Sequence, residues 1–343
     1  EASKVRLIQP YVGGAFGGKI SGIIEILAGA LSLKCNHRPV RLEMSREEEF
    51  TCTFVRQPAR ITYKTGVGSN GDFLAREVRL LWEAGAYGDY EVLISRNAGY
   101  SASGPYRIPN VRIDSYCVYT NKPVAGAYRG FGVPETCFGY EGQVDRIARE
   151  LGMDPVELRL RNGVETGDLT PTGQTLVSVG LKECIRRAAD GLGGSDETAA
   201  RAGKRRGRGL ACMSKFTVTG AHVQSAIKIN EDGSAVLLSS AVEHGQGAHT
   251  ILRQIAAEAL GLDPQRISMG QPDTAMTPYG WETSASKTSF FDGNAVRLAA
   301  GDAKEQLFRA AAVLLEAAPE DLEALDGRIH PRGSPERSVS FAD

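Results

Sequence analysis

The chain has 343 residues, of which 42% are hydrophobic and 24% charged, a composition typical of globular proteins and long enough for two domains of ordinary size. Lysine and arginine total 40 against 41 for aspartate and glutamate, so the net charge of -1 predicts no long-range attraction to nucleic acid or to an anionic membrane. No apolar run approaches the ~20 residues that a membrane-spanning helix requires.

The first unusual stretch is a glycine-rich loop at residues 13–19, between a predicted strand at residues 4–8 and a predicted helix at residues 20–34. Glycine lacks a Cβ and reaches positive φ without strain, so such a loop lets the backbone fold closely round a ligand. The glycine and lysine spacing matches a P-loop, but Ile20 stands where that motif needs a magnesium-binding serine or threonine. An anion-binding turn is therefore predicted, with nucleotide hydrolysis and a plain structural turn kept as alternatives.

Alternating apolar and polar residues predict an antiparallel hairpin next. The two strands, at residues 59–63 and 73–82, flank an Asn-Gly turn. Residues 85–105 show neither a helical nor a strand period, so they predict a long functional loop, with Arg96 in its middle.

A second glycine-rich stretch follows a predicted strand at residues 111–119. It occupies residues 126–132 and leads into a helix that ends at Leu151, with Phe138 and Val144 expected to face the core. The arginine and the phenylalanine in this stretch are separated by one glycine and flanked by another, so few neighbouring side chains shield them.

The remaining elements predict a second domain. They are a strand at residues 210–218, a hairpin at 223–229 and 235–240, a third glycine-rich turn at 242–250 before a helix ending at Leu260, and a hydroxyl-rich segment at 283–289 before a helix at 294–317. The predicted fold class is α+β, with two domains that each pack helices on a mixed or antiparallel sheet. The first domain is expected at residues 1–165, a linker at 166–209 and the second domain at 210–343.

The six cysteines contain no C-x-x-C pair, and their wide spacing fits neither a zinc site nor an iron–sulfur cluster. Buried reduced thiols are typical of cytoplasmic proteins. The start at Glu1 does not resemble a signal peptide. The sequence therefore predicts a soluble protein of the cytoplasm.

Four loops rich in glycine, serine and threonine each precede a helix, so we expect them to converge on one large anionic ligand. Together and in this order they resemble the molybdenum-cofactor-binding subunit of the xanthine dehydrogenase and aldehyde oxidase family. The matching segments are residues 13–19 for its Gly-Gly-x-Phe-Gly-Gly-Lys loop, 127–132 for its Arg-Gly-Phe-Gly segment, 245–247 for its Gly-Gln-Gly turn, and 283–296 for its serine-rich segment.

The resemblance implies two molybdenum-cofactor-binding domains that bind molybdopterin, or its cytosine dinucleotide form, with the metal held by the pterin and not by side chains. The implied cofactor-binding residues are Gly14, Ala15, Phe16, Gly17, Arg129, Gly245, Gln246, Gly247, Ala285, Ser286, Lys287 and Thr288. Of these, residues 14–17 approach the metal, residues 129 and 245–247 contact the pterin region, and residues 285–288 surround its phosphate. The resemblance further implies that Phe131 and Phe216 stack on a ring substrate, which Arg96 anchors.

The implied activity is that of a molybdenum-dependent oxidoreductase, which hydroxylates an aromatic N-heterocycle or an aldehyde with water as the oxygen source. Electrons would pass to iron–sulfur centres and FAD, which other subunits or domains carry. The remaining parts of the molybdenum subunit and a homodimer of the whole complex complete the implied partners, with no nucleic acid and no membrane. Ile20 replaces the glutamate that purine-oxidising members carry, which argues against xanthine as the substrate.

Two features depart from the family pattern. The general-base glutamate of its Gly-x-Gly-Glu motif has no match in this chain, and the family's subunit is longer at both ends. We therefore expect a fragment, either an excised piece or a split subunit, that is inactive alone. A non-catalytic module that holds or delivers molybdopterin remains the first alternative, and a P-loop-like nucleotide-hydrolysing enzyme the second.

Overall fold

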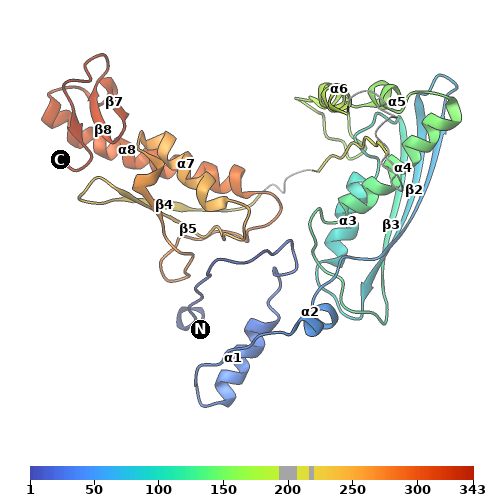
Figure 1. Ribbon diagram of the computed structural model, residues 1–343, viewed down its shortest axis with the longest axis horizontal. Coiled ribbons are helices and arrows are strands. Elements are labelled where there is room, and N and C mark those ends of the chain that lie inside the picture. The colour runs from blue at the N-terminus through green and yellow to red at the C-terminus, as the bar shows by residue number, and fades with distance from the viewer. Residues whose placement is uncertain (193–206, 216–219) are drawn as a thin grey trace, which may run out of the picture. The chain divides into compact units, whose positions relative to one another are not determined.

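The computed structural model describes residues 1–192, 207–215 and 220–343 (Figure 1). The chain forms two compact units, which we name by their places in the sequence. The central unit is Phe16–Phe216, and the terminal unit joins Glu1–Ala15 to Thr217–Asp343. The domain limits 1–165, 166–209 and 210–343 stay a prediction. The contacts within the terminal unit show in addition that the first fifteen residues pack with the C-terminal part of the chain.

The central unit is built on a three-stranded sheet. β1 (Ala59–Val67) pairs antiparallel with β2 (Phe73–Gly85), and β2 pairs parallel with β3 (Asn110–Tyr119). The hairpin predicted from the Asn-Gly turn and the strand predicted at residues 111–119 are thus confirmed. Alternate residues of β2 are buried, because one face of the sheet is covered and the other is open.

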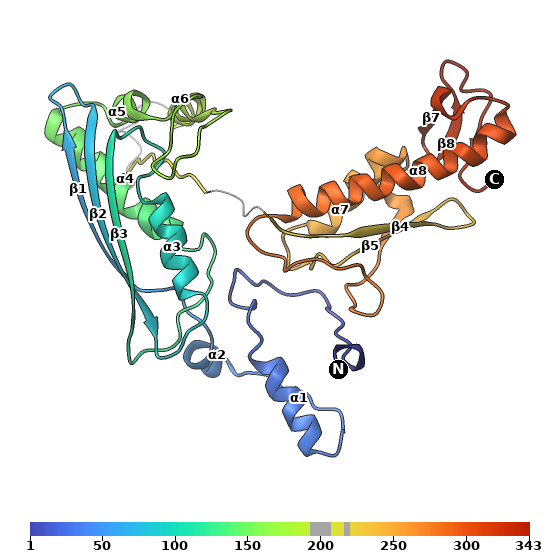
Figure 2. The same ribbon diagram turned by 180° about the vertical axis from the view of Figure 1, so that it is seen from behind.

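Two helices lie on the covered face, as Figures 1 and 2 both show: α3 (Glu91–Ser101) and α4 (Val133–Leu151). The prediction of a long loop at residues 85–105 is wrong, because α3 occupies its middle. The small residues that hid the helical period allow close packing. Ala98 is completely buried, and a methyl group on Gly99 would lie 3.6 Å from Cβ of Ser115 on β3.

The predicted helix ending at Leu151 is confirmed as α4, but the predicted orientation of one side chain is wrong. The buried row of α4 includes Thr136, Tyr140 and Val144, which are four residues apart and face the sheet. Phe138 lies on the opposite side of the helix and is 86% exposed. Its apolar character alone therefore did not reveal which way it faces.

The other helices of the central unit are α1 (Ile24–Lys34), α2 (Arg46–Cys52), α5 (Pro155–Asn162) and α6 (Leu181–Gly191). The helix predicted at residues 20–34 begins only at Ile24. Buried Arg159 of α5 is paired with Glu141 and Asp145 of α4, both at 2.8 Å, which fixes the two helices against each other.

The terminal unit has the same layering on a smaller sheet. β4 (Ser225–Ile229) pairs antiparallel with β5 (Ala235–Ser239), which pairs parallel with β6 (Ile267–Met269). Over one face lie α7 (Ala248–Leu260) and α8 (Gly293–Leu315), preceded by a π-helical turn at Thr288–Asp292. The predicted hairpin and both predicted helices are confirmed, as is the α+β class.

The remaining short elements of the terminal unit are a small antiparallel sheet and three 3-10 turns. They are β7 (Leu322–Leu325), β8 (Arg328–Pro331), β9 (Val339–Ser340), and the turns Ala2–Lys4, Pro264–Arg266 and Pro319–Asp321. In the described part of the chain, no helix combines the length and the apolar character needed to cross a membrane.

Two predicted strands do not form where the chain is described. Residues 4–8 make a single bridge, from Ile8 to Asp273, and Val5 and Leu7 are more than 60% exposed. Residues 210–215 form no strand, and the rest of the strand predicted at 210–218 lies outside the described residues. An alternating pattern becomes a strand only when a partner strand supplies the hydrogen bonds.

Candidate functional site

Backbone strain occurs in three of the four loops that the sequence singled out. The described residues include eight non-glycine residues with positive φ, and four of them lie in the predicted ligand-binding stretches. These four are Phe16 at 53°, Phe131 at 56°, Ala285 at 52° and Ser286 at 59°. A left-handed conformation costs such residues roughly 1–3 kcal/mol each, and strained residues of this kind cluster at functional sites.

The first glycine loop spans the division of the chain, since Gly14 and Ala15 belong to the terminal unit and Phe16 and Gly17 to the central unit. In the central unit, the carbonyl oxygen of Phe16 accepts a hydrogen bond from the N–H of Arg129 at 2.7 Å. A methyl group on Gly17 would lie 2.5 Å from the carbonyl oxygen of Ala127. Gly17 is therefore required by the approach of residue 127, whatever the ligand.

The side chain of Arg129 is exposed, and no hydrogen bond or ion pair holds its guanidinium within the described part of the chain. Its backbone is fixed on both sides, by Phe16 at the N–H and by Arg56 at the carbonyl oxygen. A guanidinium always carries its charge and offers several donors in one plane. This arrangement suits an anionic or oxygen-rich ligand.

Phe131 is half-buried, with its ring meeting the edge of the Tyr90 ring at a centroid distance of 5.9 Å. Its carbonyl oxygen accepts a hydrogen bond from Nδ2 of Asn97 at 2.6 Å. Phe216, predicted to stack on the other face of a ring substrate, lies outside the described residues. The pairing of these two phenylalanines stays a prediction.

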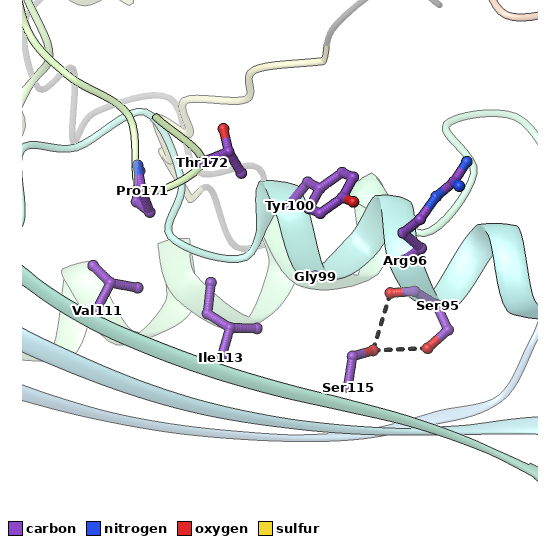
Figure 3. A pocket seen from close by; sticks show the side chains of 9 residues that line it. All are labelled: Ser95, Arg96, Gly99, Tyr100, Val111, Ile113, Ser115, Pro171 and Thr172. Carbon is purple, nitrogen blue, oxygen red and sulfur yellow. Dashed lines mark hydrogen bonds between the residues drawn. The ribbon is translucent and has the colours of Figure 1, made fainter. Parts of the chain in front are cut away.

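Arg96 lines a pocket of about 330 Å³ between α3, β3 and the turn at Pro171 and Thr172 (Figure 3). Figure 3 shows its guanidinium pointing away from β3, and no ion pair holds it in the described part of the chain. The described lining includes this one cation, several hydroxyl groups and no carboxylate. The charged end of Arg96 therefore lies away from the β3 wall of the pocket, where the lining consists of hydroxyl and apolar side chains.

The terminal unit brings three of the predicted segments together. The N–H of Val12 donates to the carbonyl oxygen of Glu243 at 3.0 Å, which attaches the entry of the first loop to the Gly-Gln-Gly turn. The N–H of Val242 donates to Oγ1 of Thr283 at 2.9 Å, which attaches the same turn to the hydroxyl-rich segment. The sequence predicted these three segments to share a site, and within this unit they are contiguous.

The Gly-Gln-Gly turn is closed by a carboxylate of the protein itself. Glu243 accepts hydrogen bonds from the N–H groups of Gly245 at 2.9 Å, Gly247 at 3.1 Å and His249 at 3.0 Å. Burial raises the pKa of Glu243, but these three hydrogen bonds outweigh burial and hold the pKa below its usual value. The N–H groups of Gly245, Gly247 and His249 are therefore already used within the turn.

Gln246 is also turned back on the loop. Its Nε2 donates to the carbonyl oxygen of Val242 at 2.9 Å, and its Oε1 accepts from the N–H of His244 at 2.8 Å. What the turn leaves open is its glycine surface. A methyl group built on Gly245 or Gly247 would meet nothing within 4 Å, and the same holds for Gly13 of the first loop. A flat ligand could therefore reach the backbone closely at these three positions.

Some hydroxyl groups of the hydroxyl-rich segment are hydrogen-bonded within the protein, and others have no partner in the described part of the chain. Thr283 bonds Val242, and Ser284 donates to Glu282 at 2.7 Å. The hydroxyls of Ser286 and Thr288 have no partner in the part of the chain that the structure describes. They are donors available to phosphate oxygens, next to the strained backbone at residues 285 and 286.

Lys287 is placed differently from its neighbours. Its side chain is fully buried, and Nζ lies 2.7 Å from Oδ2 of Asp292, which is also buried. The backbone N–H of Lys287 donates to the carbonyl oxygen of Ser284 at 3.1 Å, so neither its ammonium nor its N–H is free for the predicted phosphate contact. Each unit by itself therefore presents open groups: the guanidiniums of Arg96 and Arg129 in the central unit, and two hydroxyls with the glycine surfaces in the terminal unit. Each set suits an anionic or oxygen-rich ligand.

Four side chains that hold these loops had no role in the sequence interpretation. They are Glu243, Arg56, Asn97 and Asp89, which accepts a hydrogen bond from Ser21 at 2.5 Å. An acidic residue just before a glycine turn and a helix is a recognisable signal for Glu243. The other three have no local signal, because their partners lie 34 to 73 residues away in the sequence.

Comparison with known proteins gives one consistent result. Residues 1–163 match one family model described as a molybdopterin cofactor-binding domain, and residues 189–343 match a second with the same description. The xanthine dehydrogenase molybdenum-binding subunit of Escherichia coli O157:H7 is 34% identical over 337 residues, which cover 95% of this chain and 45% of that protein.

Two further relatives extend the comparison. The nicotinate dehydrogenase large molybdopterin subunit of Eubacterium barkeri is 40% identical over 189 residues, covering 55% of this chain and 44% of that protein. The crystal structure of quinoline 2-oxidoreductase from Pseudomonas putida 86 superposes with a TM-score of 0.87 at 30% identity, covering 98% of this chain and 46% of that chain. The chain thus spans about half the length of the relatives it matches.

Proposed function

The chain belongs to the molybdopterin cofactor-binding family, and we propose that it forms the cofactor-binding part of a molybdenum hydroxylase acting on an aromatic N-heterocycle or an aldehyde, with water as the oxygen source. One observation carries the proposal: four strained residues, at positions 16, 131, 285 and 286, fall in the loops that resemble those of the family. The names of the relatives, which refer to xanthine, nicotinate and quinoline, support a heterocyclic substrate.

When bound, the molybdenum–pterin group, as molybdopterin or its cytosine dinucleotide form, supplies the two-electron oxidation chemistry. Residues of this chain bind and orient it. Gly13, Gly245 and Gly247 allow close approach, because nothing of the protein lies where their Cβ atoms would be. Arg129 supplies a fixed positive charge, and residues 285, 286 and 288 supply hydroxyl and backbone donors for phosphate oxygens.

The substrate is positioned by the central unit in this proposal. Arg96 anchors a negatively charged or oxygen-bearing substituent, and Phe131 and Phe216 stack on the ring. Ile20, in place of the glutamate of purine-oxidising members, argues against a purine. Nicotinate and quinoline are therefore better first substrates to test than xanthine.

Other chains or domains complete the enzyme. We infer that iron–sulfur centres and FAD on such partners accept the electrons, that the complex forms in the cytoplasm, and that it can be a homodimer. Residues 1–343 contain no Gly-x-Gly-Glu motif, so they offer no candidate for the general base of this family's pattern. Turnover by this chain alone is not expected.

The test is metal and pterin analysis of the native complex that contains this chain. We expect one molybdenum and one pterin per copy, measured by elemental analysis and by the fluorescence of the oxidised pterin. Absence of both molybdenum and pterin would contradict the proposal. Cofactor without oxidation of nicotinate, quinoline or any aldehyde would favour a module that only binds or delivers it, and magnesium-dependent phosphate release lost on Lys19→Ala would favour nucleotide hydrolysis.

A further inference from the structure

The loop at residues 127–132, the Arg129 loop, has an unfavourable backbone. Three consecutive residues have positive φ: Gly130 at 95°, Phe131 at 56° and Gly132 at 88°. Phe131 carries a Cβ, so its left-handed conformation persists only where surrounding groups hold it. The free chain would therefore sample other conformations unless contacts from outside the loop prevented it.

Two side chains from distant parts of the central unit make those contacts. Nη2 of Arg56, between α2 and β1, donates to the carbonyl oxygen of Arg129 at 2.8 Å. Nδ2 of Asn97, on α3, donates to the carbonyl oxygen of Phe131 at 2.6 Å. The peptide group before Gly130 and the one after Phe131 are therefore fixed from outside.

Arg56 makes two further contacts that fix its own position. Its Nη1 donates to Oε1 of Glu135 at 2.7 Å, and its guanidinium carbon lies 4.3 Å from the centre of the Tyr128 ring. A planar guanidinium can make all three contacts at once, whereas the ammonium of a lysine is a single point charge. The residue type at position 56 thus matches a role in holding the loop.

We propose that Arg56 and Asn97 are positioning residues, which lock the Arg129 loop so that the guanidinium of Arg129 meets the cofactor and the ring of Phe131 meets the substrate. The roles of Arg129 and Phe131 rest on the proposed function, but the locking of the loop does not. A displaced loop would misplace both groups together, and misplacement by about 1 Å can slow a reaction about a hundredfold.

The test compares Arg56→Ala, Arg56→Lys and Asn97→Ala in the native complex, with Arg60→Ala as the matched control, since Arg60 is exposed and makes no ion pair in the described part of the chain. Amide hydrogen exchange at residues 127–133 is expected to rise about tenfold in all three variants and to stay unchanged in the control. Arg56→Lys should resemble Arg56→Ala, because charge alone cannot restore the contacts.

Kinetics with nicotinate or quinoline give the second readout. In variants whose molybdenum and pterin contents equal those of the unmodified complex, we expect kcat to fall at least tenfold, with a smaller change in KM. The double variant Arg56→Ala/Glu135→Ala removes the carboxylate that the single variant leaves without its partner. If amide exchange also rises in the double variant, the unpaired carboxylate is not the cause. The rise then comes from the lost contact between Arg56 and the loop.

The two hypotheses fail separately. Unchanged exchange in Arg56→Ala and Asn97→Ala overturns the positioning role, even if the complex holds molybdenum and turns over. Raised exchange with unchanged kcat overturns the catalytic part of the proposal and leaves the locking of the loop. Absence of molybdenum and pterin from the unmodified complex ends the proposed function, while the exchange experiment still decides whether Arg56 and Asn97 lock the loop.

Discussion

The two glycine turns that precede α4 and α7 look alike in sequence and are stabilised in opposite ways. Each ends in a left-handed glycine at the N-cap of its helix, Gly132 at 88° and Gly247 at 83°, and neither glycine has a side chain with which to cap the helix. The turn before α7 is closed from within, by the carboxylate of Glu243. The turn before α4 is held from outside, by Arg56 and Asn97.

The glycines of the two turns also differ in how closely other groups of the protein surround them. A methyl group on Gly130 would lie 2.3 Å from the ring of Pro134, and one on Gly132 would lie 2.8 Å from Cβ of Ala98. The fold of the central unit therefore requires these two glycines. Gly245 and Gly247 face empty space, so their lack of a side chain favours close approach of a ligand. A glycine motif thus has two distinct physical meanings in one chain.

The largest effect is expected at the buried ion pair of the terminal unit. Lys287→Ala removes one partner of a fully buried ion pair and should lower the free energy of unfolding by about 3–5 kcal/mol. The paired change Lys287→Met/Asp292→Leu should cost far less, because no unpaired charge stays buried. Urea unfolding followed by Trp281 fluorescence in a Trp82→Phe background measures both. Equal costs for the two variants would show that the charge pairing is not what matters.

A comparison of matched glycine substitutions addresses the two turns directly. Gly132→Ala should cost about 3 kcal/mol, from left-handed strain and from overlap with Ala98, whereas Gly247→Ala should cost only the strain, about 1 kcal/mol. Urea unfolding of both variants in the full chain provides the values, with Trp82 reporting the central unit and Trp281 the terminal unit. Gly247→Ala should nevertheless reduce cofactor content more than its stability cost explains. Similar costs at the two positions would remove the distinction between the turns.

The smallest effect concerns Glu243 and depends on pH. Glu243→Gln should cost about 1 kcal/mol at neutral pH, the usual contribution of a helix cap. Because folding lowers the pKa of Glu243 through the three N–H hydrogen bonds, its stabilisation is fully present above the pKa of the unfolded chain and is lost as the pH falls through the folded pKa. The difference in melting temperature between the variant and the unmodified chain should therefore vanish in acid. Glu231→Gln, at an exposed hairpin turn, is the control and should show no such dependence.

Local patterns in the sequence predicted much of the fold, and the position of the candidate site stays a prediction. The β1–β2 hairpin, α4, α7 and α8 were identified because their periods and turn residues are local properties. The glycine-rich loops were identified for the same reason, since a need for positive φ is visible as glycine. The helix α3 was missed, because its small residues, Ala98 and Gly99, hid the helical period and are explained only by their packing in the fold.

The sequence by itself determined where glycine-rich loops precede the helices. Only the tertiary structure decided which polar groups of those loops are already paired within the protein. Lys287 turns inward to Asp292, Glu243 occupies the N–H groups of its own turn, and Phe138 faces outward on α4. The physical reason is that satisfying a buried charge or an N–H group depends on partners that folding brings close. Arg56 shows this most clearly, since it holds the carbonyl oxygen of a residue 73 positions further along the chain.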